Sequence, residues 1–371
     1  MVIDSIIENR KHNKNLINLK DLKEVILYGV GNLGKKLDKE LSEWGVNVAG
    51  LIDRNAEHIH YDKKVCGLQE ADKNLNHNIP VILSGLFDCN SEKDIRADLN
   101  KIGFGIVYAL HELDWENIFD TEFGRSVFIS SYNINDLSKD RDDIVFAYNL
   151  LSEDIDKKCF LNHLSAYRNM DFSVLSKPGS LACQYSDDDL KQQIDYSNFI
   201  DCGAYDGDSL RNLLSAGKNI RRCLAFEPQL DLCNKMMETE WKDVCVAVIP
   251  CGVSSNIEQK CFAVSAEGKS SGKVSDRGDV VVQCETIDMI ADVFKPTFIK
   301  MDIEGSELEA LHGAEKTIQK YKPSLAICVY HDLSHLWKAA LFIHKINNSY
   351  NFYLRNYNIL GFETVLYAIP K

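Results

Sequence analysis

An apolar stretch that runs into a glycine-containing loop is the strongest local signal in the sequence. Residues 199–209 read FIDCGAYDGDS, with Gly203 and Gly207 four positions apart and Asp201 near the end of the apolar run. Because glycine has no Cβ, it lets the backbone approach a ligand closely. We predict a strand, a ligand-binding loop and a helix in that order. The alternative is a plain strand-to-helix turn with Asp208 as a first-turn acid.

An acidic residue at the end of the next predicted strand strengthens this signal. Glu227 comes 20 positions after Gly207, and a carboxylate there can accept hydrogen bonds from both hydroxyl groups of a ribose. The two features together predict a site for S-adenosyl-L-methionine (SAM), with Asp201 facing its positively charged side. The expected cofactor-binding residues are Asp201, Gly203, Ala204, Asp206, Gly207, Glu227, Pro228 and Asp302.

Further acids and a histidine follow the fourth and fifth predicted strands of the same half of the chain. Ligands of open α/β sheets bind outside the carboxyl ends of the strands, which places Asp302 and Glu304 at the reaction crevice. His331 is a candidate general base because the pKa of imidazole lies near working pH. We predict Asp302, His331 and Glu304 as catalytic residues. The alternatives are loop support for His331 and a helix-dipole role for Glu304, the role we also favour for Glu307.

The elements that must position these residues alternate between strands and helices. The expected strands are 199–202, 222–226, 244–249, 298–301, 325–329, 352–357 and 363–369. The last two form a hairpin through a turn with Gly361. This pattern is typical of the class I methyltransferase sheet, which has one antiparallel member, whereas a dinucleotide-binding fold would continue with parallel crossovers.

Residues 196–370 resemble the FkbM-type methyltransferase family. The resemblance rests on FIDCGAYDGDS, AFEP, ETID and above all IKMDIEGSELEALHGA (299–314), and the segments YHDLSHLW and FYLRNYNILGFETVLYA resemble one branch of it. Members of that branch often carry His where this chain has Asn356. The resemblance implies SAM as methyl donor and methylation of a hydroxyl group, commonly on sugars, glycolipids or polyketide-derived acceptors.

A sugar hydroxyl is a poor nucleophile at pH 7, so a base or a cation must assist the transfer. We predict His331 or Asp302 as the base. Mg²⁺ held by Asp302 and its neighbours would instead lower the pKa of the hydroxyl. We do not favour the metal, because few of the oxygen ligands that Mg²⁺ needs are identifiable.

The first part of the chain carries a second glycine loop. Gly29, Gly31 and Gly34 follow a predicted strand and open a helix, and Asp53 ends the next strand, which is the context of a dinucleotide-binding site. The stretches LYGVGNLG and GLIDRN also resemble the small nucleotide-sugar- or cofactor-binding domains at the front of some sugar acetyltransferases. Two interpretations of this first domain stay open: it forms a second nucleotide site, or it keeps the fold without binding a ligand. If this site binds a ligand, a nucleotide sugar fits better than NAD, since the sequence shows no residues that would carry out hydride transfer.

These elements predict an α/β protein with two Rossmann-like doubly wound domains, 1–110 and 197–371, joined by a helical connector, 111–196. The insertion 261–285 is expected to form a hairpin, either with a tip that closes over substrate or with a plain solvated tip. Two other functions stay open: a bifunctional protein with an NAD-dependent sugar-modifying front domain, and a non-catalytic interaction module that retains SAM.

Composition narrows the function classes. The net charge of −13 over 371 residues argues against a general nucleic-acid surface, because phosphate binding needs clustered Lys and Arg. No run approaches the roughly 18 apolar residues of a membrane span. The twelve cysteines are scattered, which favours reduced thiols and a cytoplasmic location. The expected partner is a small sugar-like acceptor, and a homo-oligomer stays open.

Overall fold

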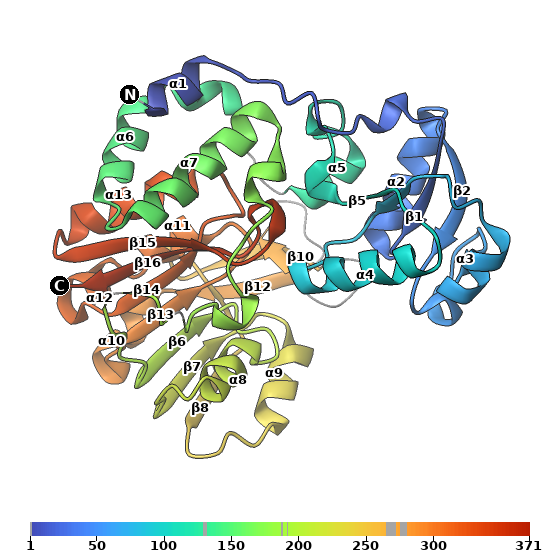
Figure 1. Cartoon of the computed structure of the whole chain (residues 1–371). Helices are drawn as coiled ribbons and strands as arrows, with labels where there is room; N and C mark the ends of the chain where they lie inside the picture. The colour runs from blue at the N-terminus through green and yellow to red at the C-terminus, as the bar shows by residue number, and fades with distance from the viewer. Residues whose placement is uncertain (1, 129–131, 187, 191, 265–271, 275–279) are drawn as a thin grey trace. The chain divides into compact units, whose positions relative to one another are not determined.

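The computed structural model describes residues 2–128, 132–186, 188–190, 192–264, 272–274 and 280–371 (Figure 1). The chain folds into two compact units. The N-terminal unit consists of Met1–Ile129, Leu161–Pro178 and Asn358–Phe362, and the C-terminal unit consists of Ser130–Phe160, Gly179–Tyr357 and Glu363–Lys371. The stretch 111–196, predicted as a connector, contributes to both units.

The described residues of the N-terminal unit form a five-stranded parallel sheet with the order β3-β2-β1-β4-β5. The strands are β1 (Glu24–Tyr28), β2 (Asn47–Ile52), β3 (Val65–Cys66), β4 (Val81–Leu83) and β5 (Val107–Tyr108). The chain winds outward from β1 to β3 and then returns to β4, so the strand order reverses between β1 and β4. The helices of this unit are α1 (Val2–Glu8), α2 (Asn32–Glu43), α3 (Leu68–Asn74), α4 (Cys89–Lys101) and α5 (Glu122–Val127), and α7 (Asp154–Asn169) contributes to both units.

Local sequence explains why β1 and α2 form. The four residues of β1 after Glu24 are buried, as expected for a parallel strand that is covered on both faces. Helix α2 buries Leu37 and Leu41, which lie four positions apart on one face.

The described residues of the C-terminal unit form a seven-stranded sheet with the order β15-β16-β14-β13-β6-β7-β8. Its strands are β6 (Asn198–Cys202), β7 (Arg222–Phe226), β8 (Cys245–Ile249), β13 (Phe298–Met301), β14 (Ser324–Cys328), β15 (Tyr350–Asn356) and β16 (Thr364–Pro370). Strand β16 pairs antiparallel with both β14 and β15, whereas the central pairs are parallel. The predicted α/β fold class with its closing hairpin is confirmed.

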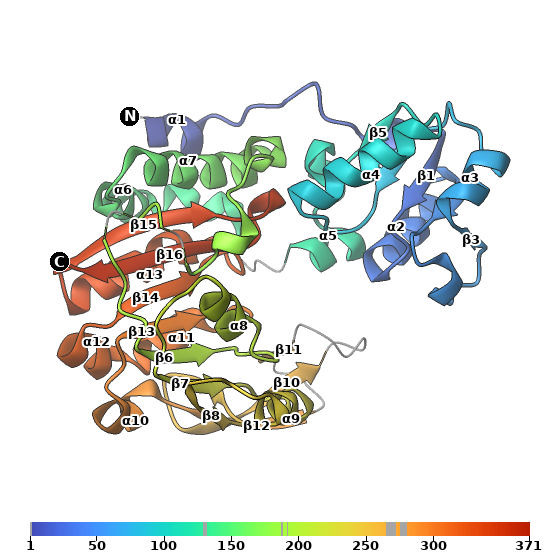
Figure 2. The same cartoon turned by 60° about the horizontal axis from the view of Figure 1, so that its bottom comes forward.

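Helices and a chain segment cover the two faces of this sheet (Figures 1 and 2). The helices are α6 (Arg141–Leu150), α8 (Asp208–Ser215), α9 (Leu230–Glu238), α10 (Ile287–Phe294), α11 (Glu307–His312), α12 (Glu315–Tyr321) and α13 (His335–Ile346). Side chains of α8 and α9 share one core cluster with Phe199, Phe298 and Tyr367 of the strands. Helices α11 and α12 pack against α13 on the other face. Among the described residues, no helix combines the length and the apolar character needed to cross a bilayer.

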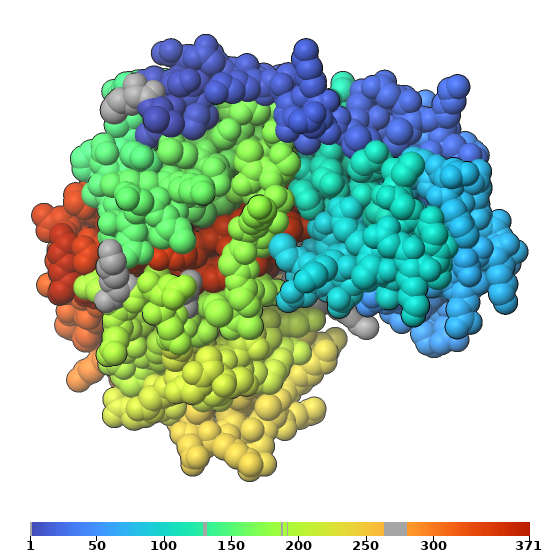
Figure 3. Space-filling model, in the orientation of Figure 1, coloured from blue at the N-terminus to red at the C-terminus, as the bar shows by residue number. Residues whose placement is uncertain are grey.

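The described residues of 179–196 (all except 187 and 191), which we call the strap, run across the strands β15 and β16. In Figure 3 the yellow-green strap lies over the red strands. The backbone amide of Gly179 donates to the carbonyl of Asn356 (2.7 Å), and Gln192 Nε2 donates to the carbonyl of Pro370 (3.2 Å). Hydrogen bonds at both ends of the strap therefore hold it to the sheet.

The insertion between β8 and β13 forms a second, smaller sheet with the order β11-β10-β12-β9 in the described part of the chain. Its strands are β9 (Gly252–Val253), β10 (Glu258–Val264), β11 (Gly272–Val274) and β12 (Val280–Glu285). Strands β10 and β12 pair antiparallel, as the hairpin prediction requires. Most of the predicted tip, 268–273, lies outside the described residues.

A buried ion pair anchors α7 to β15 within the C-terminal unit. The carboxylate of Asp156, which is fully buried, pairs with the guanidinium of Arg355. Asp156 also accepts hydrogen bonds from the backbone amides of Leu354 (2.9 Å) and Glu153 (2.8 Å). Arg355 has a second acidic partner, because its guanidinium also lies 2.7 Å from Glu153 Oε2. Removing Asp156 therefore leaves Arg355 paired with Glu153 but leaves the amides of Leu354 and Glu153 without this acceptor, and each unsatisfied buried group costs about 1–3 kcal/mol.

We therefore expect Asp156→Ala to lower the free energy of unfolding by about 2–5 kcal/mol, measured by urea denaturation of the full chain. The matched control is Asp154→Ala, since Asp154 is exposed at the start of the same helix and its loss should cost about 1 kcal/mol or less. Equal losses in the two variants would contradict a special role for the Asp156–Arg355 pair.

Candidate active site

Strand β6 leads into the predicted cofactor loop through Gly203. This residue adopts a left-handed backbone (φ +78°), and an added Cβ would overlap the carbonyl oxygen of Asp302. The close approach that demands glycine here is therefore one between two backbone segments, the exits of β6 and β13. The loop and Asp302 are held side by side.

A buried ion pair between β6 and β13 holds the loop and Asp302 in this position. Lys300 Nζ, on β13, lies 3.0 Å from Asp201 Oδ1 and donates to the carbonyl of Gly203 (2.7 Å). Burial raises the pKa of Asp201 to about 6, against the opposing effect of Lys300. Burial alone would lower the pKa of Lys300, but the carboxylates of Asp201 and Asp302 outweigh it and raise that pKa above its usual value. Asp201, expected to face the cofactor, is thus the internal partner of Lys300.

Glu227 lies where β7 ends, beside the same loop. Its side chain is buried, and its two oxygens accept hydrogen bonds from the backbone amides of Tyr205 (3.0 Å) and Gln229 (2.9 Å). Burial raises the pKa of Glu227, and the two amides oppose that rise. Pro228 follows it and is half-buried. Glu227 thereby holds the loop after β6 while keeping unused lone pairs.

The remaining predicted loop residues shape the start of α8. The backbone amide of Ala204 donates to the carbonyl of Phe226 (3.0 Å), and Asp206 pairs with the guanidinium of Arg211. Gly207 is left-handed (φ +86°), and an added Cβ would lie 2.6 Å from the ring of Trp241. Asp201 lies within β6 itself, and the other predicted cofactor residues lie along the loop after β6 and the exits of β7 and β13.

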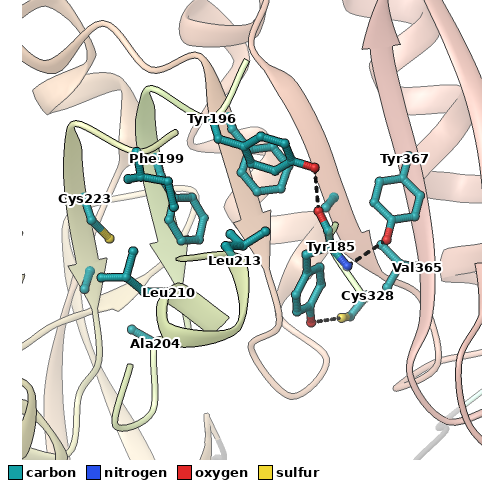
Figure 4. Close-up of a cluster of buried hydrophobic side chains, with 14 of the residues drawn as sticks. Tyr185, Tyr196, Phe199, Ala204, Leu210, Leu213, Cys223, Cys328, Val365 and Tyr367 are labelled. Atoms are coloured by element: carbon teal, nitrogen blue, oxygen red, sulfur yellow. Dashed lines mark hydrogen bonds between the residues drawn. The ribbon is translucent and has the colours of Figure 1, made fainter. Parts of the chain in front are cut away.

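Asp302 follows β13 and presents its carboxylate to two tyrosines. Its Oδ2 accepts a hydrogen bond from Tyr185 (3.1 Å) and its Oδ1 accepts one from Tyr330 (3.2 Å). About 23% of the side chain remains exposed, so the carboxylate is reachable from solvent. Figure 4 shows Tyr185 beside β14, where its hydroxyl meets the sulfur of Cys328 at 3.2 Å.

His331, which follows β14, faces the same point. Its Nε2 lies 3.6 Å from Asp302 Oδ1 and 3.6 Å from Glu304 Oε2, while its Nδ1 donates to Glu307 Oε1 at 2.9 Å. The structure thus brings the three predicted catalytic residues together around one imidazole nitrogen. Glu304 reaches this position with a left-handed backbone (φ +57°).

Glu307 is a member of this cluster that the sequence interpretation did not include. We favoured a helix-dipole role for it, and it does lie in the first turn of α11, but its side chain is fully buried beside His331. Its Oε1 also accepts from the backbone amides of Ile303 (3.0 Å) and Gly305 (3.3 Å), and its Oε2 lies 3.2 Å from His335 Nδ1. The spacing of His331 and His335, four positions apart, was the available signal for a shared acidic partner.

The charges around His331 control its protonation. Burial alone would lower the pKa of His331, but Glu307, Asp302 and Glu304 outweigh it and raise the pKa to about 9. Burial alone would likewise raise the pKa of Glu307, but His331 and His335 hold it below its usual range. In the free protein His331 is therefore a cation at neutral pH, with Glu307 ionised beside it.

Two more residues reach this region, and neither was predicted as a site residue. Glu363, directly before β16, accepts a hydrogen bond from Gln184 Nε2 of the strap (2.5 Å). Burial, with the nearby carboxylate of Asp302, raises the pKa of Glu363 to about 7. Gln184 stands in no recognised pattern, and Glu363 lies within the stretch FYLRNYNILGFETVLYA, where nothing marked it as a site residue. Only the tertiary fold places the strap beside the start of β16.

The part of the chain that carries most of these residues matches a known protein family. Residues 201–354 match the model of the methyltransferase FkbM domain. This part of the chain is an FkbM methyltransferase domain. The resemblance to this family that the motifs predicted is confirmed, and the domain is that of a methyltransferase. The resemblance of the front part of the chain to acetyltransferase front domains stays a prediction.

Solved structures of other proteins are similar to this chain in fold. The methyltransferase FkbM from Methylobacillus flagellatus KT is 19% identical, with a TM-score of 0.64 over 99% of this chain and 97% of that chain. An rRNA methylase from Streptococcus thermophilus is 14% identical, with a TM-score of 0.29 over 48% of this chain and 88% of that chain. The second likeness is too low to carry an argument. No curated protein matches the sequence significantly.

One atom each of Asp302, Glu307 and His331 lies close enough to the others to form a metal-ligand set in the FkbM domain. Glu307, however, already accepts two backbone amides and contacts two histidines. Mg²⁺ prefers oxygen ligands and retained waters, which this mixed and enclosed set offers poorly. We therefore assign Glu307 to orienting His331.

Glu307→Gln removes the charge that contributes most to the raised pKa of His331. We expect the pKa of His331 to fall from about 9 to below 7.5, roughly its ordinary range. The measurement is an NMR pH titration of protein with isotope-labelled histidine. Glu309→Gln is the matched control, since Glu309 is exposed on the same helix. An unchanged titration of His331 in Glu307→Gln would contradict the pairing.

Proposed function

We propose that the FkbM domain transfers a methyl group from SAM to a hydroxyl group of a sugar, nucleotide-sugar or glycan-like acceptor. The observation that carries this proposal is the arrangement of His331. A buried carboxylate orients one ring nitrogen, and the other nitrogen faces two partly exposed carboxylates at the carboxyl edge of the sheet. This is the geometry of a base held ready for a hydroxyl proton.

The residues beside the first loop suit SAM. Each oxygen of Glu227 accepts one backbone amide, and a carboxylate oxygen has a further lone pair for a ribose hydroxyl. The loop between Gly203 and Gly207 passes directly beside Asp302. When bound, SAM would supply a methyl group activated by a sulfonium. The ion pair of Asp201 with Lys300 would keep the loop in place.

The chain's own residues can then position and deprotonate the acceptor. Asp302, held by the hydroxyls of Tyr185 and Tyr330, would accept a hydrogen bond from an acceptor hydroxyl. His331 Nε2 would take the hydroxyl proton once it is itself neutral, and Glu307 would stabilise the imidazolium that results. Positioning of this kind contributes effective molarities of about 10⁵ M or more.

The carboxylates near His331 support a polyhydroxylated acceptor. Asp302 and Glu304 each keep about a fifth of the side chain exposed, at 23% and 22%. Ionised carboxylates only accept hydrogen bonds, and the hydroxyl groups of a sugar are suitable donors. Glu363 adds a third carboxyl group next to Asp302.

The place of the cofactor is tested by Glu227→Gln. The change removes a charged acceptor, so we expect the dissociation constant for SAM to rise about 10- to 100-fold, the scale of charge-assisted hydrogen bonds. Isothermal titration calorimetry measures it. The control is Asp231→Asn, since Asp231 is exposed in the first turn of α9. If Glu227→Gln binds SAM like the unaltered protein, our placement of the ribose is wrong.

The pH dependence of transfer tests the base. His331 must lose its proton to act, and its pKa is about 9, so we expect the initial rate to rise between pH 7 and 9 and then to level off. The rate is measured as S-adenosylhomocysteine formed with UDP-glucose, UDP-N-acetylglucosamine or free hexoses as trial acceptors.

His331→Gln should slow this transfer about 10²- to 10⁴-fold and leave SAM affinity intact. His312→Gln, on the exposed side of α11, should leave the rate unchanged and serves as the control. A rate that stays flat from pH 7 to 10 would move the base from His331 to Asp302.

A further inference from the structure

A depression in the N-terminal unit lies outside the methyltransferase domain. It has a volume of about 520 Å³ and is lined by Val30, Gly31, Lys35, Asp53, Asn55, His58, Ile59 and His60. These residues follow the carboxyl ends of β1 and β2, and β1 borders the point at which the strand order reverses. Open α/β sheets bind nucleotides at such a position.

Each of the three glycines in the loop after β1 occupies its position for a different structural reason. Gly29 is left-handed (φ +96°), which makes the tight turn. An added Cβ on Gly34 would overlap the carbonyl oxygen of Gly29, so this glycine allows α2 to pack closely on the loop. Gly31 differs from both, because an added Cβ would have no protein atom within 4 Å. Packing therefore does not require glycine at position 31, whereas the approach of a diphosphate to the backbone does.

Asp53 presents a carboxylate to the same depression. Its Oδ2 accepts from the backbone amide of Val30 (2.8 Å), and its Oδ1 accepts from that of Asn55 (2.8 Å). Glu227 holds the amides of Tyr205 and Gln229 in the same manner at the end of β7. In both units, the acid after the second strand holds the loop after the first strand and keeps lone pairs for a diol.

The other wall of the depression suits an anion. Gly31 caps α2 without a side-chain hydrogen bond, and the first turn of this 12-residue helix contains no acid. The amides of such a turn attract phosphate groups. Lys35, His58 and His60 add cationic or neutral donors to the lining, and Lys35 Nζ is held by the carbonyl of His60 (3.0 Å).

We propose that this depression binds a nucleoside diphosphate group, free or as part of a nucleotide sugar. The ribose hydroxyls would face Asp53, and the diphosphate would lie over Gly31 at the start of α2. Dinucleotide-binding sheets combine two halves of three strands each. Here β1, β2 and β3 complete one half, and the described residues after them supply only β4 and the two-residue β5. One complete half corresponds to one nucleotide.

The test is calorimetric titration of the full chain with UDP, ADP and NAD⁺ in parallel. The decisive variant is Gly31→Leu, which fills the depression from a residue whose backbone (φ −72°) any side chain can adopt. The matched control is Gly67→Leu. Gly67 also caps a helix, has φ −79°, has no atom within 4 Å of an added Cβ and does not line the depression.

We expect UDP or ADP to bind the unaltered protein, and we expect the same dissociation constant for the Gly67→Leu variant. In Gly31→Leu the dissociation constant should rise at least tenfold, and Asp53→Asn should weaken binding in the same direction. SAM binding should be unaffected by Gly31→Leu, which separates this result from the fate of the methyltransferase site.

Four results would overturn the proposal. They are no binding of UDP or ADP at millimolar concentration, equal binding by Gly31→Leu, displacement of the nucleotide by SAM, and binding of NAD⁺ without binding of UDP or ADP. The last would indicate a dinucleotide site instead of a mononucleotide site.

Discussion

The ion pair between Lys300 and Asp201 is the interaction on which the methyltransferase unit depends most. Both residues lie on the central strands β13 and β6, and both side chains are almost completely buried, at 3% and 0% exposed. Burying two charges costs several kcal/mol for each ion unless they are paired. The ammonium also donates to the carbonyl of Gly203. The first loop can therefore move only if a buried charge loses a partner, and this keeps Asp302 and the loop in contact.

The pair of Glu307 and His331 lies farther from the sheet than the pair of Lys300 and Asp201. Its position depends on that first pair, because both Asp302 and the turn that leads to Glu307 follow β13. Two backbone amides, Ile303 and Gly305, turn Glu307 inward. The buried ion pair of Lys300 and Asp201 therefore lies inside the sheet, and the imidazole of His331, which can titrate, lies at the edge of the sheet. The partly exposed carboxylates of Asp302 and Glu304 lie outside it.

Much of this fold could be predicted from the sequence. Strands β7 and β13 match the expected ranges because each is a short apolar run between polar residues, and Glu227, Asp302 and His331 follow strands of the same sheet. Strand β3 could not be predicted, since two residues carry no periodicity. The roles of Glu307 and Lys300 could not be predicted either, because an acid in a first helical turn and a lysine in a strand are ordinarily exposed. Only the register of β6 with β13 places Asp201 directly opposite Lys300.

The reversed direction of β16 decides which of its two ends lies at the edge of the sheet that carries Asp302 and His331. Among the described strands of the seven-stranded sheet, β16 alone runs opposite to β14, so its beginning, at Glu363, lies at the edge where the parallel strands end. Its last residues therefore leave from the edge where the parallel strands begin. Any extension after Lys371, whether an affinity tag, a fused protein or a surface linker, would depart on that side. A protein immobilised there would keep the edge that carries Asp302, His331 and Glu363 away from the support.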